Sequence, residues 1–353
     1  MAGLLFVPRA RQSWQEAKRG LAACGEETST MSSLAARRLV HLAVALSASG
    51  CAQGLPTDPQ PYFSASLTLS QPATHFYGND FMYSSQPSSN EVVVYKRKKG
   101  YGLTRYETLT SGFSRPMGMV TTPDGRWYVA NSGAADVLVY RTTHKGPQGP
   151  QATIRDDGEV PVNVDATRNQ QLVAVSNGST TGDGAGSVSV YLNREKRASR
   201  NLTYGGDPVQ GEGVAIDSAG NCYWSFNDPD KLTGSIVEFA GCNGSGLPLV
   251  SGILTAGGLA FDNSGNLYYV DQLLGIFKCQ GTSACSLFAP IILGGLIIPT
   301  NINFDNSEPQ NLWVSDAAGY IDALNPQGLI AYILQILGGV THPPIGIAPA
   351  PGG

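Results

Sequence analysis

Few residues of this chain have the types and spacing needed for chemistry. One carboxylate, Glu212, and three amides, Asn163, Asn301 and Asn303, lie at or near the starts of similar apolar segments. Hard cations bind to several oxygen ligands at once, and a single carboxylate does not provide them. We therefore predict that these four residues form a ligand-binding group without a catalytic residue, metal ion or cofactor. The alternative, in which they hold water and cap strand ends, stays open.

Familiar catalytic motifs are absent from the sequence. It contains no G-x-G-x-x-G, P-loop, H-E-x-x-H or G-x-S-x-G motif in a usable context. Its 4 histidines are scattered, which argues against a multi-histidine metal site. The net charge is −4, and the basic run at 96–99 is too short for a nucleic-acid surface. These features favour a binding or interaction protein whose partner is an unidentified protein or small molecule.

Cysteines indicate disulfide chemistry. Two of the 6 cysteines, Cys24 and Cys51, precede the region of regular pattern, and four remain within it. Cys279 and Cys285 flank QGTSA in a predicted hairpin, so their Cα atoms can approach closely enough for a disulfide. Cys222 begins the second strand of the fourth unit and Cys242 lies just past the third strand, its antiparallel neighbour, so we expect them to form the second pair. We expect both bridges in an exported protein.

A repeating unit must position the candidate residues. Five segments share a small residue, alternating apolar positions, a turn rich in Asp, Asn and Gly, and an aromatic-rich strand. They begin at Gly118, Pro161, Gly213, Gly258 and Asn301, and a sixth start at Gly346 runs into the C-terminus. Repeats spaced by about 45 residues are typical of propeller blades. The loops that precede these starts would encircle a central channel, with Glu212 exposed at its mouth.

The first and last segments of the repeat pattern together contain the strands of one complete unit. Residues 81–95 match the second and third strands of the other units and lack a first strand, whereas residues 346–348 supply only a first strand. We therefore predict an all-β, six-bladed propeller with four antiparallel strands per blade. The C-terminal strand joins the N-terminal blade and closes the ring.

The repeats, from GMVTTPDGRWYVAN to GLAFDNSGNLYYVD, resemble NHL-type repeats of six-bladed, TolB-like propellers. This superfamily includes the gluconolactonase and senescence-marker-protein family. The resemblance implies a divalent metal in the central channel and lactone hydrolysis. In that family the metal ligands lie one residue before each repeat start, where this chain has Met117, Val160, Glu212, Gly257, Thr300 and Ile345. Because Glu212 is the one carboxylate among them, the sequence departs from the family pattern.

The N-terminal region is typical of an export signal. Residues 1–50 form the predicted leader: Met31 is the expected true start, Arg37 and Arg38 precede an apolar run, and Ser49-Gly50-Cys51 resembles a lipobox. We expect lipid on Cys51, with cleavage by an ordinary signal peptidase as the alternative. Residues 51–75 would then be a flexible tether and residues 76–353 the propeller. The membrane would be reached only through the lipid anchor.

Together these features favour an exported propeller that acts as a non-catalytic binding or interaction module, on the bacterial cell envelope or secreted. The alternative function is a metal-dependent, lactonase-like hydrolase with its site in the central channel. A structural role within a cell-surface assembly is the third hypothesis.

Overall fold

The computed structural model describes residues 81–98, 102–143, 146–157, 159–167, 169–180, 185–205, 209–291, 296–305, 309–335 and 343–350. All of them belong to one compact unit, Gln71–Gly353. The predicted leader and tether, with Met31 and Cys51, lie outside the described residues and stay predictions. Among the residues described, no helix has the length and apolar character needed to cross a membrane.

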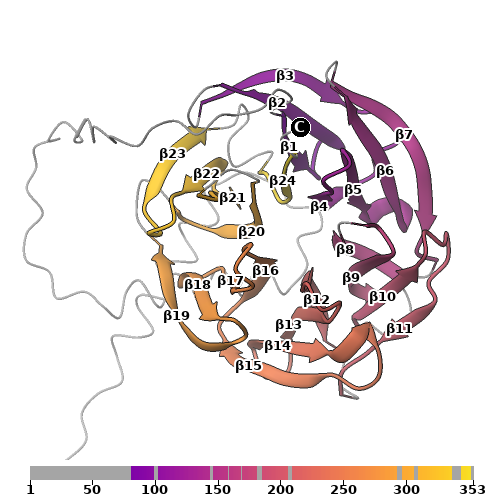
Figure 1. Cartoon of the computed structure of the whole chain (residues 1–353), viewed down its shortest axis with the longest axis vertical. Coiled ribbons are helices and arrows are strands. Elements are labelled where there is room, and N and C mark those ends of the chain that lie inside the picture. Colours follow the sequence, from indigo (N-terminus) through magenta and orange to yellow (C-terminus); the bar gives the residue numbers. More distant parts are fainter. Residues whose placement is uncertain are drawn as a thin grey trace, which may run out of the picture. The chain divides into compact units, whose positions relative to one another are not determined.

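Six four-stranded antiparallel sheets surround a common axis, and the innermost strands β24, β4, β8, β12, β16 and β20 lie nearest the centre (Figure 1). This arrangement confirms the predicted all-β, six-bladed propeller. From innermost to outermost strand, the blades are: blade I, β24 (Ile347–Pro349), β1 (Phe81–Gln86), β2 (Glu91–Arg97) and β3 (Leu103–Leu109); blade II, β4 (Pro116–Thr121), β5 (Arg126–Asn131), β6 (Asp136–Thr143) and β7 (Gly146–Arg155); blade III, β8 (Glu159–Ala166), β9 (Leu172–Thr180), β10 (Ser187–Leu192) and β11 (Arg200–Leu202); blade IV, β12 (Gln210–Ile216), β13 (Cys222–Asp228), β14 (Thr233–Phe239) and β15 (Leu247–Ile253); blade V, β16 (Ala256–Phe261), β17 (Leu267–Asp271), β18 (Gly275–Gln280) and β19 (Ser283–Pro290); and blade VI, β20 (Pro299–Phe304), β21 (Leu312–Asp316), β22 (Tyr320–Leu324) and β23 (Ile330–Gln335).

Ring closure follows the prediction from the sequence. Strand β24 pairs with β1 in the register Met82–Pro349, Tyr83–Ala348 and Ser84–Ile347. The amide of Ala350 donates to the carbonyl of Phe81 at 2.7 Å, which extends the pairing by one residue. The first blade is thereby completed by the last strand of the chain, so that β1 is paired on both sides.

Short turns connect the first and second strands of blades II to V. In blade IV the Asp217 carboxylate accepts from the amides of Ala219 and Asn221, each at 2.9 Å. In blade V Asp262 accepts in the same way from Ser264 and Asn266. Aspartate favours such turns because its side chain satisfies amides that the strands leave unpaired.

The blades pack face to face through apolar and aromatic side chains. Between blades I and II, the rings of Tyr83 and Trp127 stack with centroids 4.3 Å apart, and Tyr140 lies 4.4 Å beyond Trp127. Hydrogen bonds join other neighbouring blades. The Ser225 hydroxyl donates to the Gly257 carbonyl at 2.6 Å, and the Trp224 indole donates to the Ser176 hydroxyl at 3.0 Å. Burial of these polar groups is compatible with stability because they have partners.

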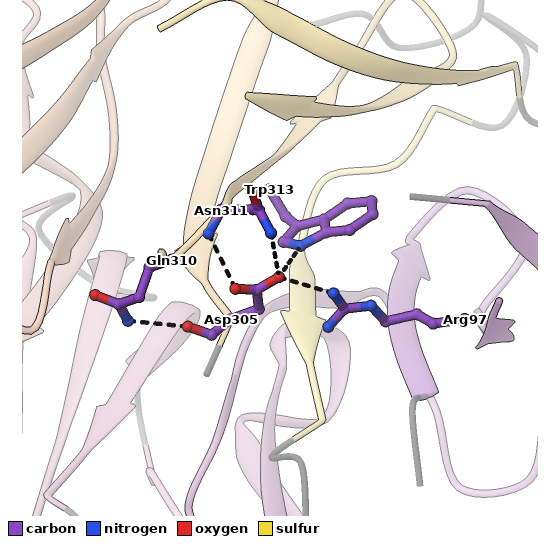
Figure 2. A network of polar contacts seen from close by, with 5 residues as sticks. All are labelled: Arg97, Asp305, Gln310, Asn311 and Trp313. Atoms are coloured by element: carbon purple, nitrogen blue, oxygen red, sulfur yellow. Dashed lines mark hydrogen bonds and ion pairs between the residues drawn. The ribbon is translucent and has the colours of Figure 1, made fainter. Parts of the chain in front are cut away.

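A buried ion pair joins the first blade to the last one. Arg97, the final residue of β2, donates to Asp305, just after β20, at 2.8 Å. The same carboxylate accepts from the Asn311 amide and the Trp313 indole, both at 3.0 Å, and the guanidinium lies over the Trp313 ring (Figure 2). The side chains of Arg97 and Asp305 are 4% and 0% exposed, so solvent does not screen the interaction.

One detail of the repeat alignment was wrong. Each innermost strand of blades II to VI has a β-bulge near its start, and in blade III the bulge falls between Pro161 and Asn163. The bulge makes Asn163, rather than Pro161, equivalent to Gly213 and Asn301. The repeat in blade III therefore starts two residues later than the sequence pattern indicated, because Pro161 supplied the small residue that the pattern requires.

Both predicted disulfides are present. Cys222 pairs with Cys242 and Cys279 pairs with Cys285. Disulfides are typical of proteins from oxidising compartments.

The two bridges should differ in their contribution to stability. They close loops with sequence separations of 20 and 6 residues. Because the longer loop loses more entropy on closure, we expect Cys222→Ser with Cys242→Ser to cost about 3 kcal/mol, and loss of the shorter bridge about 2 kcal/mol at most. Urea unfolding of each double variant measures both costs. A larger loss from the shorter bridge, or free thiols at all four positions in oxidised protein, would contradict this expectation.

Candidate functional site

The channel has two mouths, defined by the direction of the innermost strands. The strand-start mouth is formed by the first residues of these strands, and the strand-end mouth by their last residues and the turns that follow. Glu212 belongs to the strand-start mouth, where it occupies the bulge between Gly211 and Gly213. A bulge re-aims the side chain that it carries.

Glu212 is half-buried, which corrects the expectation of an exposed rim carboxylate. Its Oε1 atom accepts a hydrogen bond of 2.8 Å from the Asn227 side-chain amide, on the second strand of its own blade. Asn227 in turn accepts from the Ala256 amide of the next blade at 2.9 Å. Glu212 therefore takes part in the packing between blades IV and V.

The donor set at the strand-start mouth does not suit a divalent metal ion. After correction of the blade III register, the residues that precede the repeat starts are Met117, Val162, Glu212, Gly257, Thr300 and Ile345. They offer one carboxylate, whereas calcium takes six to eight oxygen ligands. Among the residues that the structure describes, no group of three or more His, Cys, Asp or Glu side chains is arranged to hold a metal.

Asn163 and Asn301 have the same structural environment in two different blades. Each is buried, and each Oδ1 atom accepts from the amide of the following residue at 2.8 Å. Asn163 lies against Gly118 and Asn301 against Gly258, so that a Cβ atom on either glycine would overlap the amide. The close approach explains why these two repeat starts are glycine.

Asn303 connects its own blade VI to the two blades that follow it around the ring. Its Nδ2 atom donates to the Met119 carbonyl of blade II at 3.3 Å and lies 3.5 Å from the Ile347 carbonyl of blade I. It also lines the strand-end mouth, whereas Glu212, Asn163 and Asn301 do not. The structure thus separates the four predicted residues, and their role in ligand binding stays a prediction.

The strand-end mouth contains a half-open depression of about 860 Å³. This volume lies within the range of sites that hold small molecules, about 300–1,000 Å³. Its wall is formed by the ends of β4, β8, β12, β16 and β20, and its rim by the turns that follow them. The residues that give it polar character are Thr121, Asp165, Asn169, Gln171, Asp217, Ser218, Asp262, Asn263, Asn303 and Gln310.

Asp165 is the carboxylate on the wall of this depression. It is half-buried, and it accepts from its neighbour Ala166 and from Ile216 of the next blade, each at 2.7 Å. Burial raises the pKa of Asp165 to about 6, although the two backbone amides favour the charged form. An ionised carboxylate accepts up to about four hydrogen bonds, so Asp165 retains acceptor capacity for a ligand.

The rim carboxylates are occupied by the turns that carry them. Besides its two backbone donors, Asp217 accepts from the side chains of Asn221 and Tyr223 at 2.9 and 3.1 Å. Asp262 accepts from the Asn266 side chain at 2.8 Å. Asp217 contributes negative charge to the depression, whereas the Asp262 carboxylate lies 3.7 Å from the Lys278 ammonium. None of the described residues that line the depression is Lys or Arg. The charge of this described lining disfavours anionic ligands.

Sequence analysis missed Asp165 for a specific reason. In the alignment that began at Pro161, Asp165 matched the turn aspartates Asp217 and Asp262. In the structure Thr167 begins the turn, since its amide donates to the Leu172 carbonyl as that of Asp217 donates to Asn221. Asp165 lies two residues earlier, within β8. When the bulge is included in the alignment, Asp165 of β8 is equivalent to Asn303 of β20. At this position of the innermost strands, these two residues are the polar ones.

Comparison with known proteins identifies the fold. No family model matches the sequence, and no curated protein matches it. Among solved structures, a protein of unknown function from Desulfotomaculum acetoxidans aligns with a TM-score of 0.55 at 12% identity, over 78% of this chain and 100% of its own. A candidate 6-phosphogluconolactonase from Bacteroides uniformis aligns with a TM-score of 0.52 at 12% identity, over 76% and 98%. Another, from Bacteroides fragilis, gives the same TM-score and identity over 76% and 97%. At these identities the likeness shows the propeller fold alone.

Proposed function

We propose that this chain is an exported propeller that binds a small polar ligand, neutral or cationic, at its strand-end mouth without catalysing a reaction. The observation that carries the proposal is the depression of about 860 Å³ with the half-buried Asp165 carboxyl and the Asn303 amide on its wall. Ligand sites are typically concave and place a few polar groups that fix orientation. Export is supported by the two disulfides, and Cys51 would anchor the protein to the envelope.

The charge of the depression defines the kind of ligand. Asp165 and Asp217 are acidic, Asp262 is paired with Lys278, and none of the described residues that line the site is Lys or Arg. A phosphorylated sugar would meet like charge there. This separates the proposal from the substrate implied by the name of the candidate 6-phosphogluconolactonases, which share the fold.

The proposal is tested by ligand-detected NMR with glucose, galactose, N-acetylglucosamine, lysine and glucose 6-phosphate. We expect binding of at least one neutral or cationic probe, and weaker or no binding of glucose 6-phosphate. Asp165→Asn should reduce the affinity about tenfold or more, because a charged acceptor hydrogen bond is worth about 1.5–3 kcal/mol. Affinity should also fall as the pH drops below about 6, where Asp165 becomes protonated.

The matched control is Glu212→Gln, the same carboxylate-to-amide change at the strand-start mouth, which should leave the affinity unchanged. Preferential binding of the phosphate ester, or failure of every probe, would contradict the proposal. The alternative function is examined in the same samples by assaying gluconolactone hydrolysis with added calcium or zinc. Metal-dependent turnover that Glu212→Gln abolishes would favour the lactonase-like hydrolase instead.

A further inference from the structure

A second hollow adjoins the depression. It is a groove of about 530 Å³ between blades V and VI, on the side of the strand-end mouth. Asp262, Asn263, Phe304 and Gln310 line both the groove and the depression. Gln310 marks the junction, because its Oε1 accepts from the Asn263 amide of blade V at 2.7 Å. The two hollows therefore adjoin one another, with the Gln310–Asn263 hydrogen bond between them, and the groove lies on the side of the outer strands.

Aromatic rings form part of the groove wall. Tyr268 lies edge-on to Phe304, with ring centroids 4.9 Å apart, and to Phe288, at 5.1 Å. Phe288 and Phe304 are half-buried, so part of each ring remains accessible. Aromatic surfaces of this kind favour ligands with a flat apolar face.

Three amide side chains are among the polar groups of the groove, and its two charged side chains are of opposite sign. Asn263, Gln310 and Asn325 line it, and an amide side chain both donates and accepts, as a hydroxyl group does. Lys278 lies 3.7 Å from the Asp262 carboxylate and 5.0 Å from the centre of the Tyr268 ring. The cation is therefore compensated within the groove. This chemistry suits an uncharged ligand rich in hydroxyl groups.

We propose that the depression and the groove together bind a neutral oligosaccharide, with one sugar at Asp165 and the following sugars along Phe304 and Phe288. This inference rests on the proposed function, because it extends the same site. Sugars present hydroxyl groups at their edges and apolar C–H faces, which match the amides and the aromatic rings. Two adjoining hollows of about 860 and 530 Å³ offer room for more than one sugar, and the carboxylates of the depression disfavour a polyanionic glycan.

The test compares chain lengths by isothermal titration calorimetry. The probes are the disaccharides and hexasaccharides of the malto-, cello-, xylo- and chito-series. We expect at least one hexasaccharide to bind tenfold or more tightly than its disaccharide. Phe288→Ala should reduce the affinity for that hexasaccharide about fivefold or more and leave disaccharide binding unchanged. Asp165→Asn should weaken both.

Two further variants distinguish the loss of a ring contact with the ligand from a general effect on folding. Phe288→Leu keeps an apolar side chain but removes the flat ring, and it should reproduce the loss for the hexasaccharide. Phe277→Ala removes a half-buried ring that stacks on Tyr269 of the same blade and does not line the groove. It should not change binding.

Each other outcome overturns this inference. Equal affinity for disaccharide and hexasaccharide, or an unchanged hexasaccharide affinity in both Phe288 variants, would show that the groove does not contribute. Binding of single sugars at Asp165 without any gain from longer chains would leave the proposed function intact and reject the extension. Binding of a decaproline peptide in place of every oligosaccharide would assign the groove to a protein partner.

Discussion

Asp305→Ala is expected to lower the free energy of unfolding by roughly 3–5 kcal/mol, because it leaves a buried arginine without its carboxylate. Arg97 and Asp305 are almost fully buried and connect blade I to blade VI. The same substitution removes the acceptor of the Asn311 amide and the Trp313 indole. Urea unfolding followed by circular dichroism measures the loss.

Arg97→Met should cost less than Asp305→Ala. After this change, Asp305 keeps the neutral donors of Asn311 and Trp313, so its charge is still partly compensated. The matched control is Arg126→Ala, which breaks a partly exposed ion pair with Asp124 at 3.4 Å. That change should cost within about 1 kcal/mol. If Asp305→Ala cost no more than Arg126→Ala, the buried network would not stabilise the ring.

Asp322→Asn is expected to stabilise the protein at neutral and alkaline pH. Asp322 in β22 is fully buried, and neither of its carboxyl oxygens has a hydrogen-bond partner. Burial, with a smaller contribution from the charge of Asp316, raises the pKa of Asp322 to about 7. The folded protein therefore holds this proton more tightly than the unfolded chain, in which the pKa is about 3.9.

The pH dependence follows from that difference. The stability from the protonated carboxyl is fully present below about pH 4, and it is lost progressively as the pH rises to 7. At about 1.4 kcal/mol per pKa unit, the loss at pH 8 approaches about 4 kcal/mol. Asp322→Asn removes the ionisable group, so we expect a gain of up to that amount at pH 8 and little change at pH 4.

Unfolding in urea between pH 4 and pH 8 measures this effect for the parent and the variant. Asp124→Asn is a control for which we expect the opposite change in stability. Hydrogen bonds and Arg126 lower the pKa of Asp124 despite its partial burial. This variant should therefore lose a small amount of stability at neutral pH. A parallel pH dependence for the parent and Asp322→Asn would mean that Asp322 does not titrate in this range.

Structural features that follow from local or repeated sequence patterns could be predicted, whereas features that depend on packing between distant residues could not. Alternation, turn aspartates and the complementary chain ends defined the blades and the ring closure, since each of these signals is local or repeats. The disulfides were predictable for the same reason, because each pair joins neighbouring strands. The polar residue Asp322 at an apolar position of YIDAL is also visible in the sequence, but its lack of a partner depends on packing against the neighbouring strands.

The candidate site was less predictable, because it depends on register. A bulge in β8 shifts the alignment of blade III by two residues, and that shift moves Asp165 from an apparent turn to the channel wall. Arg97 and Asp305 are 208 residues apart, and nothing in the local pattern of either pairs them. Their contact follows from the closed ring, which places the first and last blades side by side.

The position of the bound sugar decides whether the strand-end mouth is the ligand site. We would determine the crystal structure of the protein grown with the tightest-binding sugar of the calorimetry series. The account predicts a sugar in the strand-end depression with its hydroxyl groups within hydrogen-bonding distance of Asp165 and Asn303. A sugar bound at the strand-start mouth against Glu212, or on a surface away from the channel, would contradict it.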